Sequence, residues 1–117
     1  MLFRSYHGFF GEFYDEVYGA NDKLAELIRT LDEYAPGSLS EFSKRSNVSD
    51  ETSQPSNTQK VRNLFADNQT IIKDLMNAYN LAERFSEYGI SNFLQDRIEA
   101  HKKHAWMLRS MLKGDQE

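Results

Sequence analysis

Hydrophobic residues recur every three to four positions over more than twenty residues in the second half of the chain. The apolar members of this stripe are Val61, Leu64, Phe65, Ile71, Ile72, Leu75, Ala78, Tyr79, Ala82 and Phe85. Asn68 is the one polar residue on it. This spacing is that of one face of an α-helix, whereas a half-buried strand alternates at every second position. The sequence therefore predicts a long amphipathic helix that packs against other helices.

A second helix is predicted from about Phe3 to Leu31. Proline lacks a backbone N–H and restricts the residue before it, so Pro36 and Gly37 are expected to keep the helix from continuing. Between residues 35 and 58 the composition changes to serines and both prolines, which is typical of a connection. Within it, Leu39 to Ser43 is predicted to form a short helix.

A third long helix is predicted after Gly89. Glycine at this point is expected to break the chain, and Ser91 or Asn92 can cap the helix that follows. The apolar stripe of that helix is Leu94, Ile98, His101, Ala105, Leu108 and Leu112. The chain is therefore predicted to be all-α, a bundle of three long helices with a short helix in the long connection.

The helix predicted at the start of the chain is too apolar for a three-helix monomer. Its aromatic residues are Phe3, Tyr6, Phe9, Phe10, Phe13, Tyr14 and Tyr18. They spread well beyond the stripe of about 100° that a surface helix buries. The excess is expected to meet something outside this chain's own core, either another copy in an oligomer or a missing helix.

Composition excludes several classes of chemistry. The chain contains no cysteine, which rules out disulfides, thiolate zinc sites, iron–sulfur clusters and cysteine nucleophiles. Any metal must therefore bind to His, Asp or Glu. No run approaches the roughly 20 apolar residues of a membrane helix, and the start lacks a secretory leader, so a soluble, cytoplasmic protein is expected.

The charge distribution does not favour nucleic acid. The formal net charge is −4, and neither tail is basic. The nearest thing to a basic cluster is formed by Arg97, Lys102, Lys103 and Arg109. A broad phosphate-binding surface, as nucleic acid requires, needs more clustered Lys and Arg than this.

His7, Asp22 and Glu26 are the candidate metal ligands. Asp22 and Glu26 are four residues apart, so they are neighbours on one helix face and can share an ion. His7 lies roughly 60° from Asp22 around the helix axis but roughly 22 Å away along it. If two copies pack this helix antiparallel about a two-fold axis, His7 of one copy approaches Asp22 and Glu26 of the other. The alternative is an ordinary solvated helix face. His101 and His104, three residues apart, are expected to pack rather than to bind metal.

The chain resembles the Dps family, the ferritin-like mini-ferritins of starvation protection. The segment from Phe3 to Leu31 is similar to the family's second bundle helix, with a histidine, fourteen intervening residues, an aspartate, three more residues and a glutamate preceded by alanine. The run from Pro36 to Phe42 resembles the family's loop and short helix. Residues 75–83 look like the third bundle helix. The fourth is matched by Phe93-Leu94, Ile98-Glu99, His101, Lys103-His104 and Trp106-Met107-Leu108-Arg109.

This resemblance implies a ferritin-like bundle that assembles into a homo-oligomeric shell of twelve subunits. Ferroxidase sites at the two-fold interfaces would oxidise Fe(II), usually with hydrogen peroxide and otherwise with oxygen, and store the ferric product. His7 would be a ligand from one subunit, and Asp22 and Glu26 would be ligands from its two-fold mate. Family members often bind DNA through basic terminal tails, which this chain does not show.

Family members begin with another bundle helix, which ends in a His-Trp segment and supplies a second histidine. The resemblance therefore implies a single ferritin-like domain over residues 1–117 that lacks the first bundle helix. The alternative function is a catalytically silent helical interaction module whose aromatic first helix docks on a partner.

Overall fold

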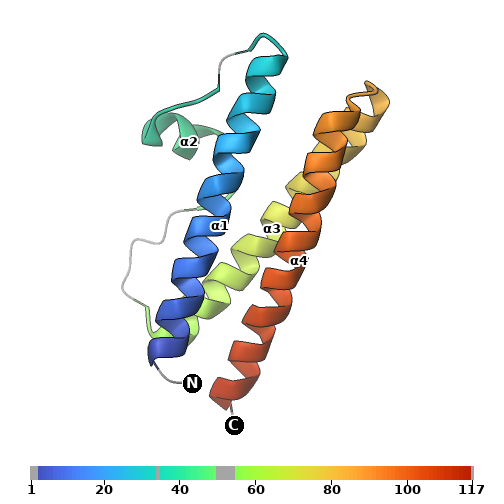
Figure 1. The fold of residues 1–117 in the computed structure, drawn as a ribbon. Helices are drawn as coiled ribbons and strands as arrows, with labels where there is room; N and C mark the ends of the chain where they lie inside the picture. Colours follow the sequence, from blue (N-terminus) through green and yellow to red (C-terminus); the bar gives the residue numbers. More distant parts are fainter. Residues whose placement is uncertain (1–2, 34, 50–54, 117) are drawn as a thin grey trace. The chain divides into compact units, whose positions relative to one another are not determined.

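The computed structural model describes residues 3–33, 35–49 and 55–116, although the side chains of residues 3–7, 39, 115 and 116 lie outside this description. Four helices follow one another in these ranges: α1 (Phe3–Thr30), α2 (Leu39–Arg45), α3 (Asn57–Arg84) and α4 (Tyr88–Gln116). The described residues contain no strand, so the prediction of an all-α chain with three long helices and one short helix is confirmed (Figure 1). The chain divides into two compact units, Met1–Ser46 and Asn47–Glu117.

In the first unit, α1 runs without interruption for 28 residues and ends one residue before the predicted limit. Its end lies well ahead of Pro36 because Asp32 adopts a left-handed backbone conformation, with φ 62°. The Asp32 N–H donates to the carbonyl of Arg29 at 2.9 Å, and the Arg29 guanidinium donates to the carbonyl of Glu33 at the same distance. The first bond satisfies one of the carbonyl groups that a helix end leaves without partners, and the second ties the chain just beyond the helix to its last turn.

The connection holds α2, which extends two residues beyond the predicted Ser43. Ser38 caps its beginning, since its hydroxyl oxygen accepts a hydrogen bond from the Glu41 N–H at 3.2 Å. Basic residues occupy its last turn, where they complement the helix dipole. The short helix therefore has stabilising side chains at both ends.

In the second unit, α3 and α4 pack against each other as an antiparallel pair (Figure 1). Ser56 caps α3 by accepting from the Gln59 N–H at 3.1 Å. The reversal at the far end is centred on Ser86, whose φ is 58°. The Ser86 N–H donates to the carbonyl of Glu83, and the Glu87 N–H donates to the carbonyl of Ala82. This pair of bonds is the Schellman arrangement that closes many helices.

The prediction that Gly89 breaks the chain and that Ser91 or Asn92 caps the last helix is wrong. Helix α4 begins at Tyr88, so all three residues lie inside it. The reason is that Ser86 takes the left-handed position that glycine usually fills. Gly89 has no positive φ and plays no part in the reversal.

Leu108, Val61 and Asn68 are the largest fully buried side chains, and Leu94, Ala105, Met111 and Ala82 complete the buried apolar set in the second unit. The stripe predicted for α3 thus faces the core at Val61, Asn68 and Ala82. The predicted stripe includes Phe85, but this residue lies just beyond the end of α3 and is 72% exposed, so it is not part of the buried face. No helix in the described part of the chain has the length and hydropathy needed to cross a membrane.

Candidate metal centre

Asp22 and Glu26 lie one turn apart on α1, and both side chains are exposed. A spacing of four residues on a continuous helix places the two Cβ atoms about 5–6 Å apart. Neither carboxylate forms a hydrogen bond or an ion pair with any residue in the described ranges. Two neighbouring carboxylates without a partner can supply hard oxygen ligands to a divalent cation.

His7 belongs to the same helix, but its side chain lies outside the described residues. Because α1 is continuous from Phe3 to Thr30, residues 7 and 22 are about 22 Å apart along its axis. One copy of the helix therefore does not bring His7 to the two carboxylates. Within one chain, the described residues bring no three His, Asp or Glu side chains close enough to share a metal ion.

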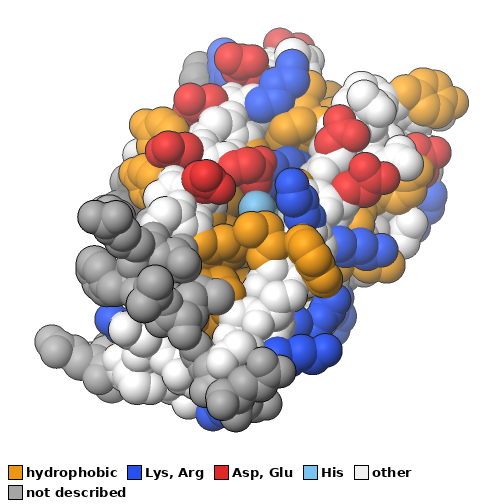
Figure 2. Space-filling view, turned by 60° about the horizontal axis from the view of Figure 1, so that its bottom comes forward, with side chains coloured by type: hydrophobic (Ala, Val, Ile, Leu, Met, Phe, Trp, Pro, Cys, Tyr) orange, Lys and Arg blue, Asp and Glu red, His pale blue; other side chains and the backbone are white. Residues whose placement is uncertain are grey.

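Two exposed tyrosines lie on α1 between His7 and the carboxylates. Tyr14 is 65% exposed, Tyr18 is 58% exposed, and their rings stack with centroids 5.9 Å apart. Tyr14, Tyr18, Asp22 and Glu26 follow one another at intervals of four residues, so they form one gently winding row on the helix. The prediction of an aromatic surface wider than one buried stripe agrees with these exposures, and Figure 2 shows hydrophobic side chains at the surface of the face in view.

His101 is held in a buried hydrogen-bond network between α3 and α4. The Asn68 side chain is fully buried, and its Nδ2 donates to the backbone carbonyl of His101 at 2.7 Å. That bond fixes the orientation of the amide, because a carbonyl only accepts. Asn68 Oδ1 therefore faces His101 Nδ1 at 2.8 Å as an acceptor, so Nδ1 carries the proton.

The other ring nitrogen, Nε2 of His101, lies 2.8 Å from Nη2 of Arg97. Arginine is always a donor, so Nε2 accepts and the imidazole is neutral. Both ring nitrogens are thus occupied within the protein, as expected for a packed histidine. His104 packs edge-on against the His101 ring, with centroids 5.3 Å apart.

The role of Arg97 could not be predicted from the sequence, where it belongs to the basic cluster with Lys102, Lys103 and Arg109. The residue is buried, so it does not contribute to a basic surface. The single signal for the network was Asn68, a polar residue on an otherwise apolar stripe. Nothing in the sequence paired that amide with a histidine 33 residues away.

Comparison with known proteins places the chain in a family. The model of the ferritin-like domain matches residues 1–116. An uncharacterized low temperature-induced protein from Nostoc is 33% identical over 114 residues, which cover 96% of this chain and 64% of the relative. The chain therefore spans somewhat less than two thirds of that relative's length.

Two crystal structures extend the comparison. Dps from Staphylococcus aureus superposes with a TM-score of 0.90 at 31% identity, over 94% of this chain and 74% of that one. Dps from Vibrio cholerae O1, described as a member of a broad superfamily of ferritin-like diiron-carboxylate proteins, gives a TM-score of 0.88 at 25% identity, over 94% and 69%. Together with the family match over nearly the whole length, these likenesses show that the chain belongs to the ferritin-like domain family, within its Dps branch.

Proposed function

We propose that this chain binds Fe(II) and oxidises it at sites shared between two copies, with hydrogen peroxide or oxygen as the oxidant, and so detoxifies and stores iron. The observation that carries the proposal is the pair of exposed carboxylates on α1, Asp22 and Glu26, which have no partner within the described residues. Membership of a family that includes ferritin-like diiron-carboxylate proteins supports the choice of metal.

The ligand chemistry suits the reaction. Carboxylate oxygens bind Fe(II) and bind the harder Fe(III) product more strongly, so Asp22 and Glu26 favour the loss of an electron by the metal. A neutral imidazole from His7 of the second copy would add a nitrogen donor without adding charge. With peroxide as the oxidant, two Fe(II) ions would each lose one electron, and the peroxide O–O bond would break as it takes up two electrons and two protons to give two waters. Hydrolysis of the Fe(III) product to the stored oxide would return protons to the solvent.

The exposed tyrosines support an antiparallel pairing of two α1 helices. If His7 of one copy lies opposite Asp22 and Glu26 of the other, the two-fold axis passes at about residues 14–17, midway between them. Tyr14 and Tyr18 flank this midpoint and are the exposed aromatic residues that a partner would cover. The same rotation that forms one site forms a second, so each pair of copies has two.

Iron oxidation by the Asp22→Asn variant tests the proposal. This change keeps the shape of the side chain but removes its charge. The proposed site then loses one of its three ligands. We expect saturable Fe(II) binding and fast oxidation in the unmodified chain, measured by anaerobic titration followed by stopped-flow absorbance after peroxide addition. The Asp22→Asn variant should lose both, whereas the matched control Asp96→Asn, an exposed aspartate on α4, should retain them. Equal rates in all three proteins would refute the assignment.

The assembly is tested separately by native mass spectrometry of the same samples. We propose a homo-oligomer built on α1 pairs, in a closed shell of twelve subunits in which both compact units form one ferritin-like domain, located in the cytoplasm. An even oligomer that loses iron but not subunits on Asp22→Asn substitution would support the shared site. A monomer without stoichiometric iron would contradict it.

The exposed aromatic surface also favours a second candidate, a catalytically silent interaction module. In that function Tyr14 and Tyr18 would dock on a different protein, and Asp22 would have no chemical task. The two candidates differ in one result, because only the first predicts that Asp22→Asn abolishes iron oxidation.

A further inference from the structure

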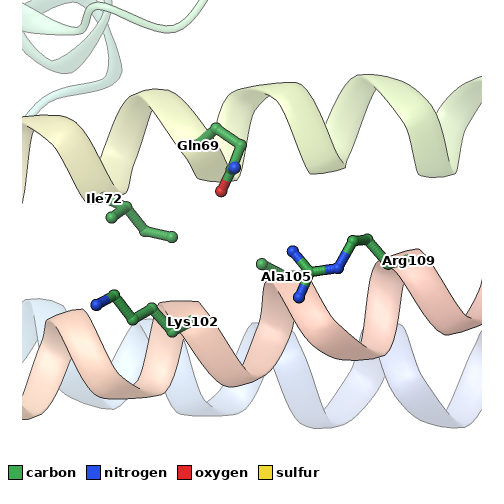
Figure 3. Close-up of a pocket in the computed structure, with 5 residues that line it drawn as sticks. All are labelled: Gln69, Ile72, Lys102, Ala105 and Arg109. Atoms are coloured by element: carbon green, nitrogen blue, oxygen red, sulfur yellow. The ribbon is translucent and has the colours of Figure 1, made fainter.

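A groove of about 350 Å³ lies between α3 and α4, within the second compact unit. It is lined by Gln69, Ile72, Lys102, Ala105 and Arg109 (Figure 3). The α4 residues among these are three and seven positions apart, a spacing that places all of them on one helix face. Ala105 lies between the two basic residues, and its small side chain leaves open the space between them.

The polar groups of the groove are all able to donate hydrogen bonds. In Figure 3 the Gln69 amide points from α3 toward the groove, and the Arg109 guanidinium reaches back along α4 toward Ala105. The Lys102 chain lies on the other side of Ala105, below Ile72. None of the five lining residues is acidic, in a chain whose formal net charge is −4.

The two positive charges are available to a ligand. Neither Lys102 nor Arg109 forms an ion pair with a residue in the ranges that the structure describes. The Arg109 guanidinium packs over the Phe65 ring, with its Cζ 5.8 Å from the ring centre. Such a cation–π contact orients the planar guanidinium while leaving its N–H donors free to bind an anion.

We propose that this groove binds a small phosphate-type oxyanion, either inorganic phosphate or a phosphate monoester. Arg109 would donate two N–H bonds to two oxygens of the anion, and the Gln69 amide would donate to a third oxygen. The flexible Lys102 chain, whose amine points away from Ala105 in Figure 3, would turn toward the anion and supply the second charge. Ile72 and Ala105 would exclude water from the apolar wall. The volume is at the lower end of the range of small-molecule pockets, about 300–1,000 Å³, which leaves room for a small organic group on the phosphate.

A small anion fits the groove better than nucleic acid does. Binding to a nucleic-acid backbone requires many positive charges along an extended surface, and Arg97, one member of the basic cluster in the sequence, is buried. Two cations line the groove, one on each side of Ala105 along α4. Its neighbour Lys103 is exposed but does not line it, which provides a matched control.

Titration of the full chain with inorganic phosphate tests this inference, by calorimetry and by amide NMR shifts at constant ionic strength in iron-free buffer. We expect saturable binding whose largest shifts fall on residues of the groove. Arg109→Gln and Lys102→Gln should each weaken binding about tenfold or more, as is typical of one lost charge-assisted contact. Lys103→Gln, which removes the same charge one residue away, should change the affinity less than about twofold.

Three results would overturn the proposal: no saturation, equal losses in all three variants, or tight binding of a short DNA duplex to which Lys103 contributes as much as Lys102. Circular dichroism of each variant shows whether its helices are intact, and Lys102→Gln provides an independent test should Arg109→Gln unfold. The experiment contains no iron, so its outcome is separate from that of the proposed iron oxidation.

Discussion

Replacing Asn68 with leucine would test whether the buried network between α3 and α4 stabilises the fold. The change keeps the approximate volume but removes both the donor to the His101 carbonyl and the acceptor for His101 Nδ1. The His101 carbonyl keeps its hydrogen bond within α4, so His101 Nδ1–H is the group left without a partner, which costs about 1–3 kcal/mol. Loss of the second bond to the carbonyl adds about 0.5–1.5 kcal/mol, and the added apolar burial of leucine offsets part of the total. We expect a net loss of about 2 kcal/mol in the free energy of unfolding.

Urea unfolding followed by circular dichroism measures that loss, which corresponds to a melting temperature lower by on the order of 10 °C for a domain of this size. Asn80→Leu, an exposed change on the same helix, is the control and should shift stability by less than about 0.5 kcal/mol. If Asn68→Leu were as stable as the control, the two bonds would contribute nothing net and the reasoning would be refuted.

The network also makes a spectroscopic prediction that does not depend on stability. Nitrogen NMR of the His101 ring should report a neutral imidazole with the proton on Nδ1 and none on Nε2. A signal from an Nε2–H form would show that the hydrogen-bond assignment is wrong. A double-mutant cycle between positions 68 and 101 should give a coupling energy of about 0.5–3 kcal/mol.

Four further predictions concern other parts of the molecule. Ser86→Gly should stabilise the chain by about 1 kcal/mol, because glycine adopts the left-handed conformation without strain; a lower urea midpoint would contradict this. Ser56→Ala should cost about 1 kcal/mol through loss of the α3 cap, whereas Ser56→Asp should retain most of the stability in the same assay. Leu108→Ala should cost about 2–5 kcal/mol, since its side chain is fully buried, and a smaller loss would mean that the core closes around the gap. Tyr18→Ser should weaken the proposed pairing of α1 helices roughly tenfold or more in sedimentation, and unchanged association would place the interface elsewhere.

The long helices of this chain could be predicted because their apolar residues repeat every three to four positions, and α3 and α4 bury the resulting stripes against each other. Their ends could not be predicted as well. Glycine most often takes the left-handed position at a helix end, which favours a break at Gly89, whereas Ser86 takes that position in the structure. After α1 it is Asp32 that takes it, ahead of Pro36 and Gly37. Those two side chains do not forbid the conformation, so the local sequence does not distinguish them from other polar residues near a helix end.

The candidate site could be predicted from the sequence less completely than the fold could. The interval of four between Asp22 and Glu26 predicts neighbours on a helix, and the continuous α1 agrees with it. A third ligand from another copy depends on how two surfaces meet, which no periodicity within one chain specifies. Likewise the pairing of Asn68 with His101 depends on how α3 and α4 are aligned, and a period in either helix alone does not contain that alignment.

The bonds from Asn68 also constrain how α3 and α4 are aligned along their axes. Apolar side chains that repeat every three or four residues can pack almost equally well when one helix slides past the other by a turn of about 5.4 Å. The amide of Asn68 contacts the ring and the carbonyl of a single residue, so such a slide would leave the Asn68 amide and the His101 Nδ1–H buried without partners. We expect this pair to select one register of the helical hairpin from several that hydrophobic packing would tolerate, as single buried polar residues do in coiled coils.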